Sequence, residues 1–358
     1  MEELKKILLI RTDRLGDLIL TLPMLPVIRR HFPEASISML VSSYASEILD
    51  GNRYIDEVLL YDSSSDPTPF LDLLRAIRGR AFDVAILVHP TLRLALLVFL
   101  ARIPIRVGTG YRWYSFLFNR KVYEHRKDAK RHEAEYNLNL LSAIGVFSDS
   151  PLEFPLEIPA SSTQRVQQLC ERVSVGEEDT LIVIHPGSGG SARDWSPKNF
   201  GKLAMRCIEE LSGKVVLTGV KGEEGIVQET MNHISRGAVN LVNQLGLKDL
   251  VALIRRADLF VSNSTGPLHI AAAVGTPVIG LFPPTSECSP ERWGPYTAKK
   301  RVFVPDRNLC SRCKGGECEA ADCMELITVE EVFDAAKLLL MSDEMRERYE
   351  AHAQRTVL

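Results

Sequence analysis

Long apolar runs are absent from the sequence, and cysteine is scarce. No apolar stretch reaches the roughly 18 residues that a bilayer-spanning helix needs, which argues against an integral membrane protein. The cysteines number only 7 among 358 residues, an odd count that argues against a disulfide framework and favours a reducing compartment. The segment before Gly16 lacks a small-residue cleavage site and predicts a first strand, not a signal peptide. We therefore expect a cytoplasmic protein.

An excess of positive charge is also missing. The chain has 43 Lys and Arg against 46 Asp and Glu, so its net charge is −3 and it lacks the basic signature of a nucleic-acid-binding protein. We expect no nucleic-acid partner. The hydrophobic content of 45% and the charged content of 25% are typical of a soluble globular protein, and the length is enough for two domains.

Two familiar nucleotide-site motifs are absent. The first loop, R-T-D-R-L-G-D, is not the G-x-G-x-x-G of a dinucleotide-binding fold, which removes the main support for a nicotinamide-dependent enzyme. No D-x-D pair occurs, so the sequence does not suggest a pyrophosphate held through a bridging metal ion. A nucleotide diphosphate would instead be held by an arginine and a helix N-terminus.

Strand and helix patterns alternate along the first half of the chain. Apolar runs predict strands at 6–10, 36–41, 58–61 and 83–88, and helical spacing covers 18–28 and 70–80. This alternation predicts a mostly parallel sheet covered on both faces, with ligands at the carboxyl ends of the strands. The rule points to the loop after Ile10 and to the loop after Val88, which begins with His89.

The alternation restarts after a segment at 148–162 that is rich in Pro and Ser. The patterns predict strands at 180–185, 214–218 and 239–241, helices at 164–173, 200–211, 224–234, 247–255 and 329–341, and strand, loop, helix and strand within 257–282. We predict two similar α/β units, at 1–155 and 156–340, that form a cleft. A charged tail helix at 344–354, within a third segment at 341–358, is expected to pack back on the first unit.

Asp17 is the first candidate for chemistry. It follows the flexible Gly16 at a helix start, close to the end of the first strand. A carboxylate there can act as a general base toward an acceptor hydroxyl, or it can be an ordinary first-turn acid of the helix. Asp13, in the same loop, is the rival base.

Three loops at strand ends of the second unit together describe a pocket for a nucleotide diphosphate. In H-P-G-S-G-G-S-A-R-D-W, the backbone N–H groups and hydroxyls around Gly187 and Ser188 can surround phosphate oxygens, and Arg193 adds a charge suited to phosphate. Glu223 follows the next strand, where a carboxylate can accept hydrogen bonds from ribose hydroxyls or a base amine.

The third loop opens a helix at N-S-T-G-P-L-H. Ser264 or Thr265 suits the N-cap and Pro267 suits the first turn. The free N–H groups near Gly266, with the helix dipole behind them, form an anion site at which His269 could also point. The alternative is an ordinary capped helix with a satisfied histidine.

The segment 102–132 is locally basic. It holds nine Lys or Arg against two acids, a net +7, interleaved with six aromatic residues. Such a surface can hold an anionic acceptor or touch an anionic membrane face. The alternative is a solvated surface whose aromatic side chains belong to the core.

Four cysteines near the C-terminus form a C-x2-C-x4-C-x4-C run, namely Cys310, Cys313, Cys318 and Cys323. The first pair has a spacing used for zinc or iron–sulfur ligands, whereas the later spacing is not standard. A metal site and free or redox-labile thiols both remain open.

These motifs together resemble glycosyltransferase family 9, the lipopolysaccharide heptosyltransferases. The resemblance rests on R-T-D-R-L-G-D-L-I-L-T-L-P, R-H-E-A-E-Y-N-L-N-L-L, H-P-G-S-G-G-S-A-R-D-W, N-S-T-G-P-L-H-I-A-A-A-V-G-T-P and E-R-W-G-P-Y, spread in the family's order over almost the whole chain. It implies a GT-B fold, with two Rossmann-like domains facing a central cleft and the acceptor on the N-terminal one. It also implies inverting, metal-independent heptose transfer from ADP-heptose to a lipopolysaccharide inner core, an anionic glycolipid. No cofactor is then required, and the enzyme would touch the inner membrane peripherally.

By position, the resemblance implies Asp17 as the catalytic base and Arg193 on the donor phosphates. It places Glu223 at the ribose or adenine, Ser188 in the phosphate loop, and Thr265, Gly266 and His269 at the phosphate-binding helix start.

Two departures from the family pattern concern the donor. Ser264 stands where many members have an aspartate, and Pro283 where a glycine is usual. The alternatives are therefore transfer from another nucleotide sugar or to another acceptor, a nucleotide-sugar epimerase, and a non-catalytic nucleotide-binding protein. The basic segment favours an acceptor site over the epimerase, and Asp17 favours an enzyme.

Overall fold

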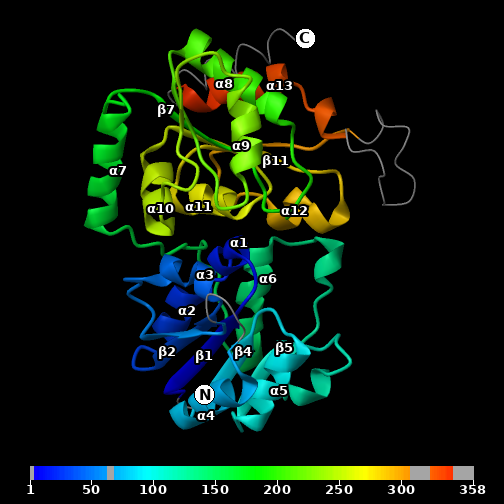
Figure 1. Cartoon of the computed structure of the whole chain (residues 1–358). Coiled ribbons are helices and arrows are strands. Elements are labelled where there is room, and N and C mark those ends of the chain that lie inside the picture. The colour runs from blue at the N-terminus through cyan, green and yellow to red at the C-terminus, as the bar shows by residue number, and fades with distance from the viewer. Residues whose placement is uncertain (1–3, 63–67, 307–322, 342–358) are drawn as a thin grey trace. The chain divides into compact units, whose positions relative to one another are not determined.

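The computed structural model describes residues 4–62, 68–306 and 323–341, and the chain divides into two compact units after Glu157 (Figure 1). Cys310, Cys313, Cys318 and the predicted tail helix at 344–354 lie outside the described residues. Each unit is an α/β layer structure built on one six-stranded sheet.

The sheet of the first unit is entirely parallel, in the order β3-β2-β1-β4-β5-β6. Its central strands are apolar and buried, because helices cover both faces. The strands are β1 (Lys6–Arg11), β2 (Ser36–Val41), β3 (Glu57–Leu60), β4 (Val84–Leu87), β5 (Ile105–Thr109) and β6 (Arg120–Val122).

The sheet of the second unit is also parallel, in the order β12-β11-β10-β7-β8-β9. Counted from its own first strand, each sheet has the order 3-2-1-4-5-6, the Rossmann order, which reverses direction beside the first strand. The strands are β7 (Leu181–His185), β8 (Lys214–Leu217), β9 (Ala238–Asn240), β10 (Leu259–Asn263), β11 (Val278–Leu281) and β12 (Lys300–Phe303).

Most of the connecting helices lie where helical spacing was predicted, whereas the helices at 43–46, 92–100, 133–139 and 290–293 were not predicted. In the first unit they are α1 (Leu15–Ile19), α2 (Met24–His31), α3 (Ser43–Ser46), α4 (Phe70–Arg80), α5 (Leu92–Leu100) and α6 (Glu133–Asn139), with 3-10 turns η1 (Glu47–Leu49), η2 (Ser115–Leu117), η3 (Arg126–Asp128) and η4 (Leu140–Ile144). In the second they are α7 (Ala160–Arg172), α8 (Pro197–Leu211), α9 (Glu224–Met231), α10 (Leu247–Arg256), α11 (Gly266–Val274), α12 (Pro290–Trp293) and α13 (Val329–Leu340), with η5 (Ser286–Cys288) and η7 (Cys323–Leu326).

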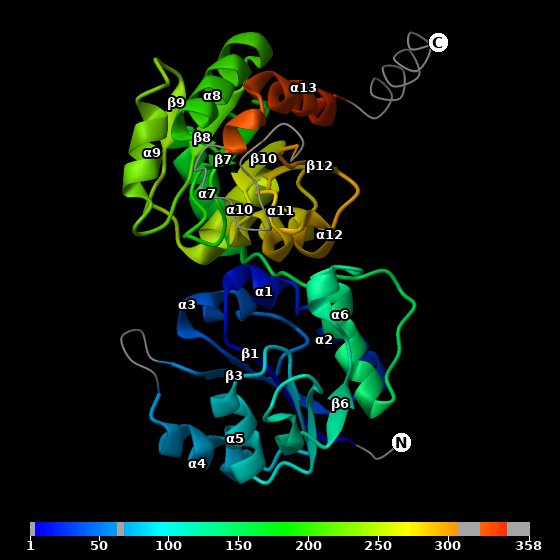
Figure 2. The same ribbon diagram turned by 90° about the vertical axis from the view of Figure 1, so that its right-hand side faces the viewer.

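The core of the second unit is formed by alternate residues of the strands and by the apolar faces of the helices. Alternate residues of the central strands, such as Ile182 and Ile184 of β7, share one buried cluster with Phe200 of α8 and Phe333 of α13. Helices α8, α9 and α13 gather on this side (Figure 2), while α10 contacts α7 and α11. Among the described residues, no helix is both long and apolar enough to cross a bilayer.

One prediction about the elements was wrong, and three short strands were not predicted. The helical spacing over 18–28 predicted one helix, but the chain forms α1 and α2 with turns between them. The break ends at Pro23, which has no N–H to donate to the preceding turn. Strands β5, β6 and β12 were not predicted, because they are short and lack long apolar runs.

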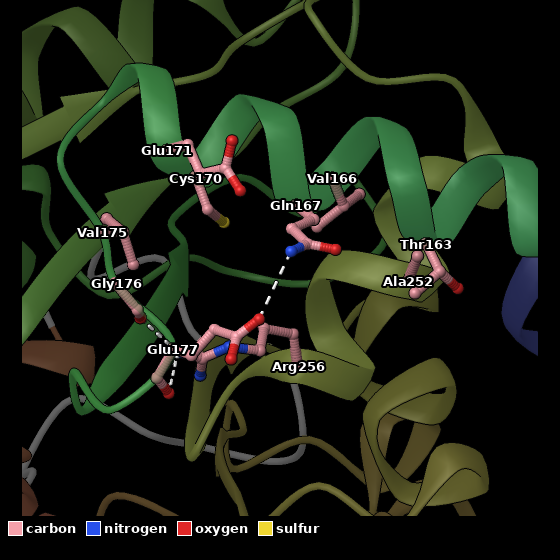
Figure 3. A pocket seen from close by; sticks show the side chains of 10 residues that line it. All are labelled: Thr163, Val166, Gln167, Cys170, Glu171, Val175, Gly176, Glu177, Ala252 and Arg256. Carbon is pink, nitrogen blue, oxygen red and sulfur yellow. Dashed lines mark hydrogen bonds between the residues drawn. The ribbon is translucent and has the colours of Figure 1, made fainter.

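A hollow of about 350 Å³ lies between α7, the segment before β7 and α10 (Figure 3). Its lining includes Val166 and Cys170, and Arg256 closes one side by donating to the carbonyl oxygens of Gly176 (2.7 Å) and Glu177 (2.8 Å). Because Gly176 and Glu177 precede β7, the hollow lies away from the carboxyl ends of the strands, where the predicted site residues are.

Candidate active site

A buried arginine organises the loop at the carboxyl end of β1. Arg11, the last residue of that strand, is only 3% exposed. Its Nε donates to Asp13 Oδ1 at 2.6 Å, its Nη2 donates to Asp17 Oδ1, and its Nη1 lies 3.6 Å from Glu133 Oε1. One guanidinium therefore gathers three carboxylates, among them the predicted base and its rival.

Helix α6 brings Glu133 to this arginine. His132 caps the helix in a reciprocal capping box, and Glu133 begins its first turn. Arg126 Nη1 donates to Glu133 Oε1 at 2.6 Å, and Asn137 Nδ2 donates to the Leu20 carbonyl at 3.0 Å, which fastens α6 to the end of α1. Two arginines thus share the charge of the three carboxylates.

The acidity of Asp17 follows from this surrounding. Burial raises the pKa of Asp17, Arg11 lowers it, and the charges of Asp13 and Glu133 raise it, so that the pKa is about 6. Burial alone would lower the pKa of Arg11, but the three carboxylates outweigh it and raise that pKa. Asp17 is therefore ionised at neutral pH and still basic enough to accept a proton, the condition that suits a general base.

The loop after β4, which the strand-end rule also predicted as part of a site, contacts the loop after β1. His89 Nδ1 lies 3.5 Å from Asp13 Oδ2. The carbonyl of Asp13 accepts from Ser42 Oγ at 3.3 Å and from the Tyr44 hydroxyl at 3.1 Å. The structure thus brings together Asp13, Asp17 and His89 at the point where the strand order reverses.

In the second unit, the loops after β7 and β10 are tied to each other at the corresponding point. Asn263 Nδ2 donates to the Pro186 carbonyl at 2.7 Å, and its Oδ1 accepts from the Trp195 N–H at 2.9 Å. Ser191 Oγ donates to the Ser264 carbonyl at 2.9 Å. The predicted phosphate loop and the predicted helix start therefore form one structure.

The Glu223 carboxylate contacts the backbone of the predicted phosphate loop after β7. Its Oε1 accepts from the Gly189 N–H at 3.0 Å, and its Oε2 accepts from the Val220 N–H at 2.9 Å and lies 3.4 Å from His185 Nε2. Burial acts to raise the pKa of Glu223, but His185 and the two N–H donors outweigh it and hold that pKa below its ordinary value. Gly187 lies directly against this carboxylate.

Helix α11 begins as predicted, with one correction. Thr265 occupies the N-cap position and Pro267 the first turn, but no side chain caps the helix. The N–H groups of the first turn are thus left without the side-chain acceptor that a capping Ser264 or Thr265 would have supplied. His269 is buried in the second turn.

Ser188 and Arg193 lie on the loop after β7. Ser188 Oγ donates to the Ala192 carbonyl at 3.2 Å, so this hydroxyl supports the loop itself. Arg193 Nη1 lies 3.9 Å from the sulfur of Cys323, the one member of the cysteine run that the structure describes. Within residues 4–62, 68–306 and 323–341, no group of three or more His, Cys, Asp or Glu side chains is arranged to hold a metal ion.

Comparison with known proteins decides the family. The family described as glycosyltransferase family 9 (heptosyltransferase) matches residues 70–323, more than half of the chain. The chain belongs to glycosyltransferase family 9. This confirms the resemblance seen in the motifs, and the protein is a glycosyltransferase.

Relatives of this family 9 enzyme span nearly its full length. A putative glycosyltransferase of Haemophilus influenzae is 30% identical over 311 residues, which cover 84% of this chain and 90% of that protein. Lipopolysaccharide heptosyltransferase 3 of Escherichia coli is 26% identical over 351 residues, covering 92% and 96%.

Solved structures confirm the GT-B fold of the family 9 enzyme. The glycosyl transferase family 9 protein of Veillonella parvula matches with a TM-score of 0.81 at 25% identity, over 95% of this chain and 98% of that one. The ADP-heptose lps heptosyltransferase II of E. coli matches with a TM-score of 0.77 at 23% identity, over 95% and 99%.

Three residues of the first site were not singled out from the sequence as functional. They are Arg11, Arg126 and Glu133. A usable signal existed for Arg11, because a charged residue that ends an otherwise apolar buried strand needs a charged partner. Glu133 lies in the R-H-E-A-E-Y-N-L-N-L-L motif and pairs with the nearby Arg126, but its pairing with the distant Arg11 has no local signal in the sequence.

Proposed function

We propose that this glycosyltransferase moves a heptose from ADP-heptose to an anionic glycolipid acceptor, a lipopolysaccharide inner core, by inverting and metal-independent transfer. Family membership and the heptosyltransferase relatives support the sugar and the acceptor class. The observation that carries the proposal is Asp17, a carboxylate of α1 that accepts a hydrogen bond from the buried Arg11 at the end of β1.

In the proposed reaction, Asp17 takes the proton from the acceptor hydroxyl as its oxygen attacks the anomeric carbon of the donor. The new bond forms on the face opposite the pyrophosphate, and the bond to the donor phosphate breaks with its electron pair on ADP. Arg11 holds one oxygen of Asp17 and leaves the other for the hydroxyl. General-base assistance of this kind contributes roughly 10²–10⁴ in rate.

We assign donor binding to the second unit. Arg193 would neutralise the leaving ADP, and the N–H groups around Gly266 would bind its phosphates, as would the loop at Gly187 and Ser188. The uncapped start of α11 and its tie to the phosphate loop support this assignment. Thr265 and His269 complete the proposed phosphate site.

We assign the acceptor to the first unit, which also carries an exposed aromatic surface. Tyr111 stacks on His125 with ring centroids 4.1 Å apart and meets Tyr123 edge to face. Trp113 is 75% exposed and Phe116 is 69% exposed, whereas the neighbouring Tyr114 and Phe118 belong to the core.

This aromatic surface is connected to the loop that holds His89. The Tyr114 hydroxyl donates to the Pro90 carbonyl at 2.7 Å, immediately after His89. Exposed cations, including Arg112 and Lys121, lie in the same segment. Aromatic faces beside exposed positive charge suit an anionic glycolipid and the anionic membrane that carries it.

The test is transfer from a panel of ADP- and UDP-sugars to a delipidated inner-core acceptor, with Asp17→Asn as the matched inactive variant. Heptose transfer from ADP-heptose that disappears in the variant supports the proposal. Transfer from a different nucleotide sugar would replace the donor, and hydrolysis or epimerisation without transfer would overturn the acceptor assignment.

A further inference from the structure

Arg126, in the turn η3, bonds the buried carboxylate of Glu133 close to the proposed base. We propose that Arg126 is a positioning residue, which holds Glu133 away from Arg11 and thereby keeps Arg11 on the two aspartates of the loop after β1. The inference rests on the proposed function, because Asp17 is a base only in that reaction, and it deepens that function by naming what supports the base.

The first argument is the unequal sharing of Glu133 between two arginines. Arg126 Nη1 donates to Glu133 Oε1 at 2.6 Å, whereas Arg11 Nη1 lies 3.6 Å from the same oxygen. That nitrogen of Arg11 is buried, and among the described residues no acceptor lies within hydrogen-bond distance of it. The other nitrogens of Arg11 donate to Asp13 and Asp17. Arg126 therefore has the stronger hold on Glu133.

The buried Nη1 of Arg11 makes this arrangement sensitive to Arg126. A buried N–H group without an acceptor is unfavourable, so a Glu133 carboxylate that Arg126 no longer held would be drawn to it. Arg11 would then divide its charge among three close carboxylates, and its interaction with Asp17 would weaken.

The second argument is that Arg126 is fixed relative to the helix that carries Asp17. The same Nη1 donates to Asn137 Oδ1 at 2.8 Å, and Asn137 Nδ2 donates to the Leu20 carbonyl at 3.0 Å. Asn137 Nδ2 also lies 3.5 Å from Thr21 Oγ1, which donates to the Asp17 carbonyl at 2.9 Å. Asn137 and Thr21 are fully buried, so this chain of bonds sets where the guanidinium of Arg126 lies.

The ionisable groups around Asp17 come from four parts of the first unit. They are Arg11 and Asp13 at the end of β1, Tyr44 of α3, His89 after β4 and Glu133 of α6. Burial raises the pKa of Tyr44, which stays neutral, and burial lowers the pKa of His89, which lies against Asp13. Because His89 also titrates on the acid side, the titration of Asp17 has to be measured at its own carboxyl group.

The experiment follows the carboxyl carbon of Asp17 by NMR titration of the full chain, which needs no ligand. In Arg126→Gln the charge of Glu133 is no longer neutralised, so the titration midpoint of Asp17 should move to higher pH by roughly 0.5–1 pH units. Arg75→Gln is the control, an equal change of charge at an exposed arginine of the same unit that bonds Asp72. Its midpoint should equal that of the wild type.

Two further variants separate positioning from general effects. Arg126→Gln combined with Glu133→Gln should titrate like Glu133→Gln alone, because Arg126 acts through that carboxylate. Arg126→Lys keeps the charge without the planar guanidinium, so its midpoint should lie between those of the wild type and Arg126→Gln.

An unshifted midpoint in Arg126→Gln would overturn the proposal, and so would a double variant that showed the sum of the two single shifts. If Arg126→Gln did not fold, an unshifted midpoint in Arg126→Lys would contradict the proposal. If Asp17→Asn kept the turnover of the wild type, the proposed function would fail, while the NMR midpoints would still decide the role of Arg126.

Discussion

Asp17 and Asp13 share one buried arginine but differ in what they can do. Both accept from Arg11, yet Asp13 also lies against His89, and the Ser42 and Tyr44 hydroxyls bond its carbonyl. Asp17 has only the arginine among these partners, and burial gives it the raised pKa of a base. The structure therefore favours Asp17 over its rival, through contacts that lie outside the loop.

Asp17→Asn should retain nucleotide binding, but its turnover should fall by a factor of roughly 10²–10⁴, because an amide cannot accept the hydroxyl proton. Turnover with ADP-heptose and titration with ADP measure the two effects separately. Asp13→Asn keeps a hydrogen-bond acceptor for Arg11 and should lose less. A larger loss in Asp13→Asn than in Asp17→Asn would exchange their roles.

Glu133 contributes to the raised pKa of the proposed base Asp17, after burial and Asp13. Turnover should be half-maximal near pH 6, falling on the acid side as Asp17 becomes protonated. Glu133→Gln removes a negative charge that raises the pKa of Asp17, so this pKa should fall. The acid limb of the pH–turnover profile should then move to lower pH.

The control for this profile is Asp72→Asn, an equal change of charge at an exposed acid of the same unit that bonds Arg75 instead. Its profile should coincide with that of the wild type. A Glu133→Gln enzyme with lower turnover but an unshifted acid limb would show that Glu133 has only a structural role.

The loops after β7 and β10 act as a pair because Asn263 fastens them together. Its side chain is fully buried, and both of its polar atoms are bonded to the loop after β7. Each strand ends at the same edge of a parallel sheet, so two short loops can share one side chain. The geometry of the proposed donor site thus depends on this pair of loops.

Asn263→Ala should lower the free energy of unfolding by about 2–4 kcal/mol, because the Trp195 N–H and the Pro186 carbonyl lose their partners in the interior. It should also weaken ADP binding. Denaturant unfolding and titration check these effects, with the exposed Asn232→Ala as control. Equal stability of the two variants would contradict the role of Asn263 as a tether.

Considered as a whole, the molecule concentrates positive charge on one segment of a chain whose net charge is −3. The exposed aromatic side chains of the same segment lie beside the proposed acceptor site. If this surface binds the membrane that holds a lipid-anchored acceptor, the effective concentration of the acceptor near the enzyme increases.

A double variant, Trp113→Ala with Phe116→Ala, should bind phosphatidylglycerol vesicles several-fold more weakly than the wild type, and phosphatidylcholine vesicles should bind neither protein appreciably. Co-sedimentation at low and high salt measures the binding, which salt should weaken. Phe147→Ala is the control, since Phe147 is 69% exposed outside the segment. Equal binding of the double variant and the control would exclude this surface as the contact.

Sequence patterns alone predicted the fold class and most of the helices and strands. Buried parallel strands are continuous apolar runs, so Ser36–Val41 and the helix Phe70–Arg80 were predicted with the bounds that the structure has. The same applies to the loops, because small and polar residues at 11–17 and 185–195 interrupt these runs. Short strands such as β6, with exposed charged residues, carry no such pattern and were missed.

Which charges meet depends on the three-dimensional fold. Arg11 and Glu133 are more than a hundred residues apart, and the chain returns from the edge strand β6 to place α6 beside the end of β1. Likewise, no local sequence pattern predicts that the Glu223 carboxylate packs against the backbone of Gly187. Periodicity reports which side of an element is buried, whereas the partner of a buried charge depends on long-range contacts that the sheet order creates.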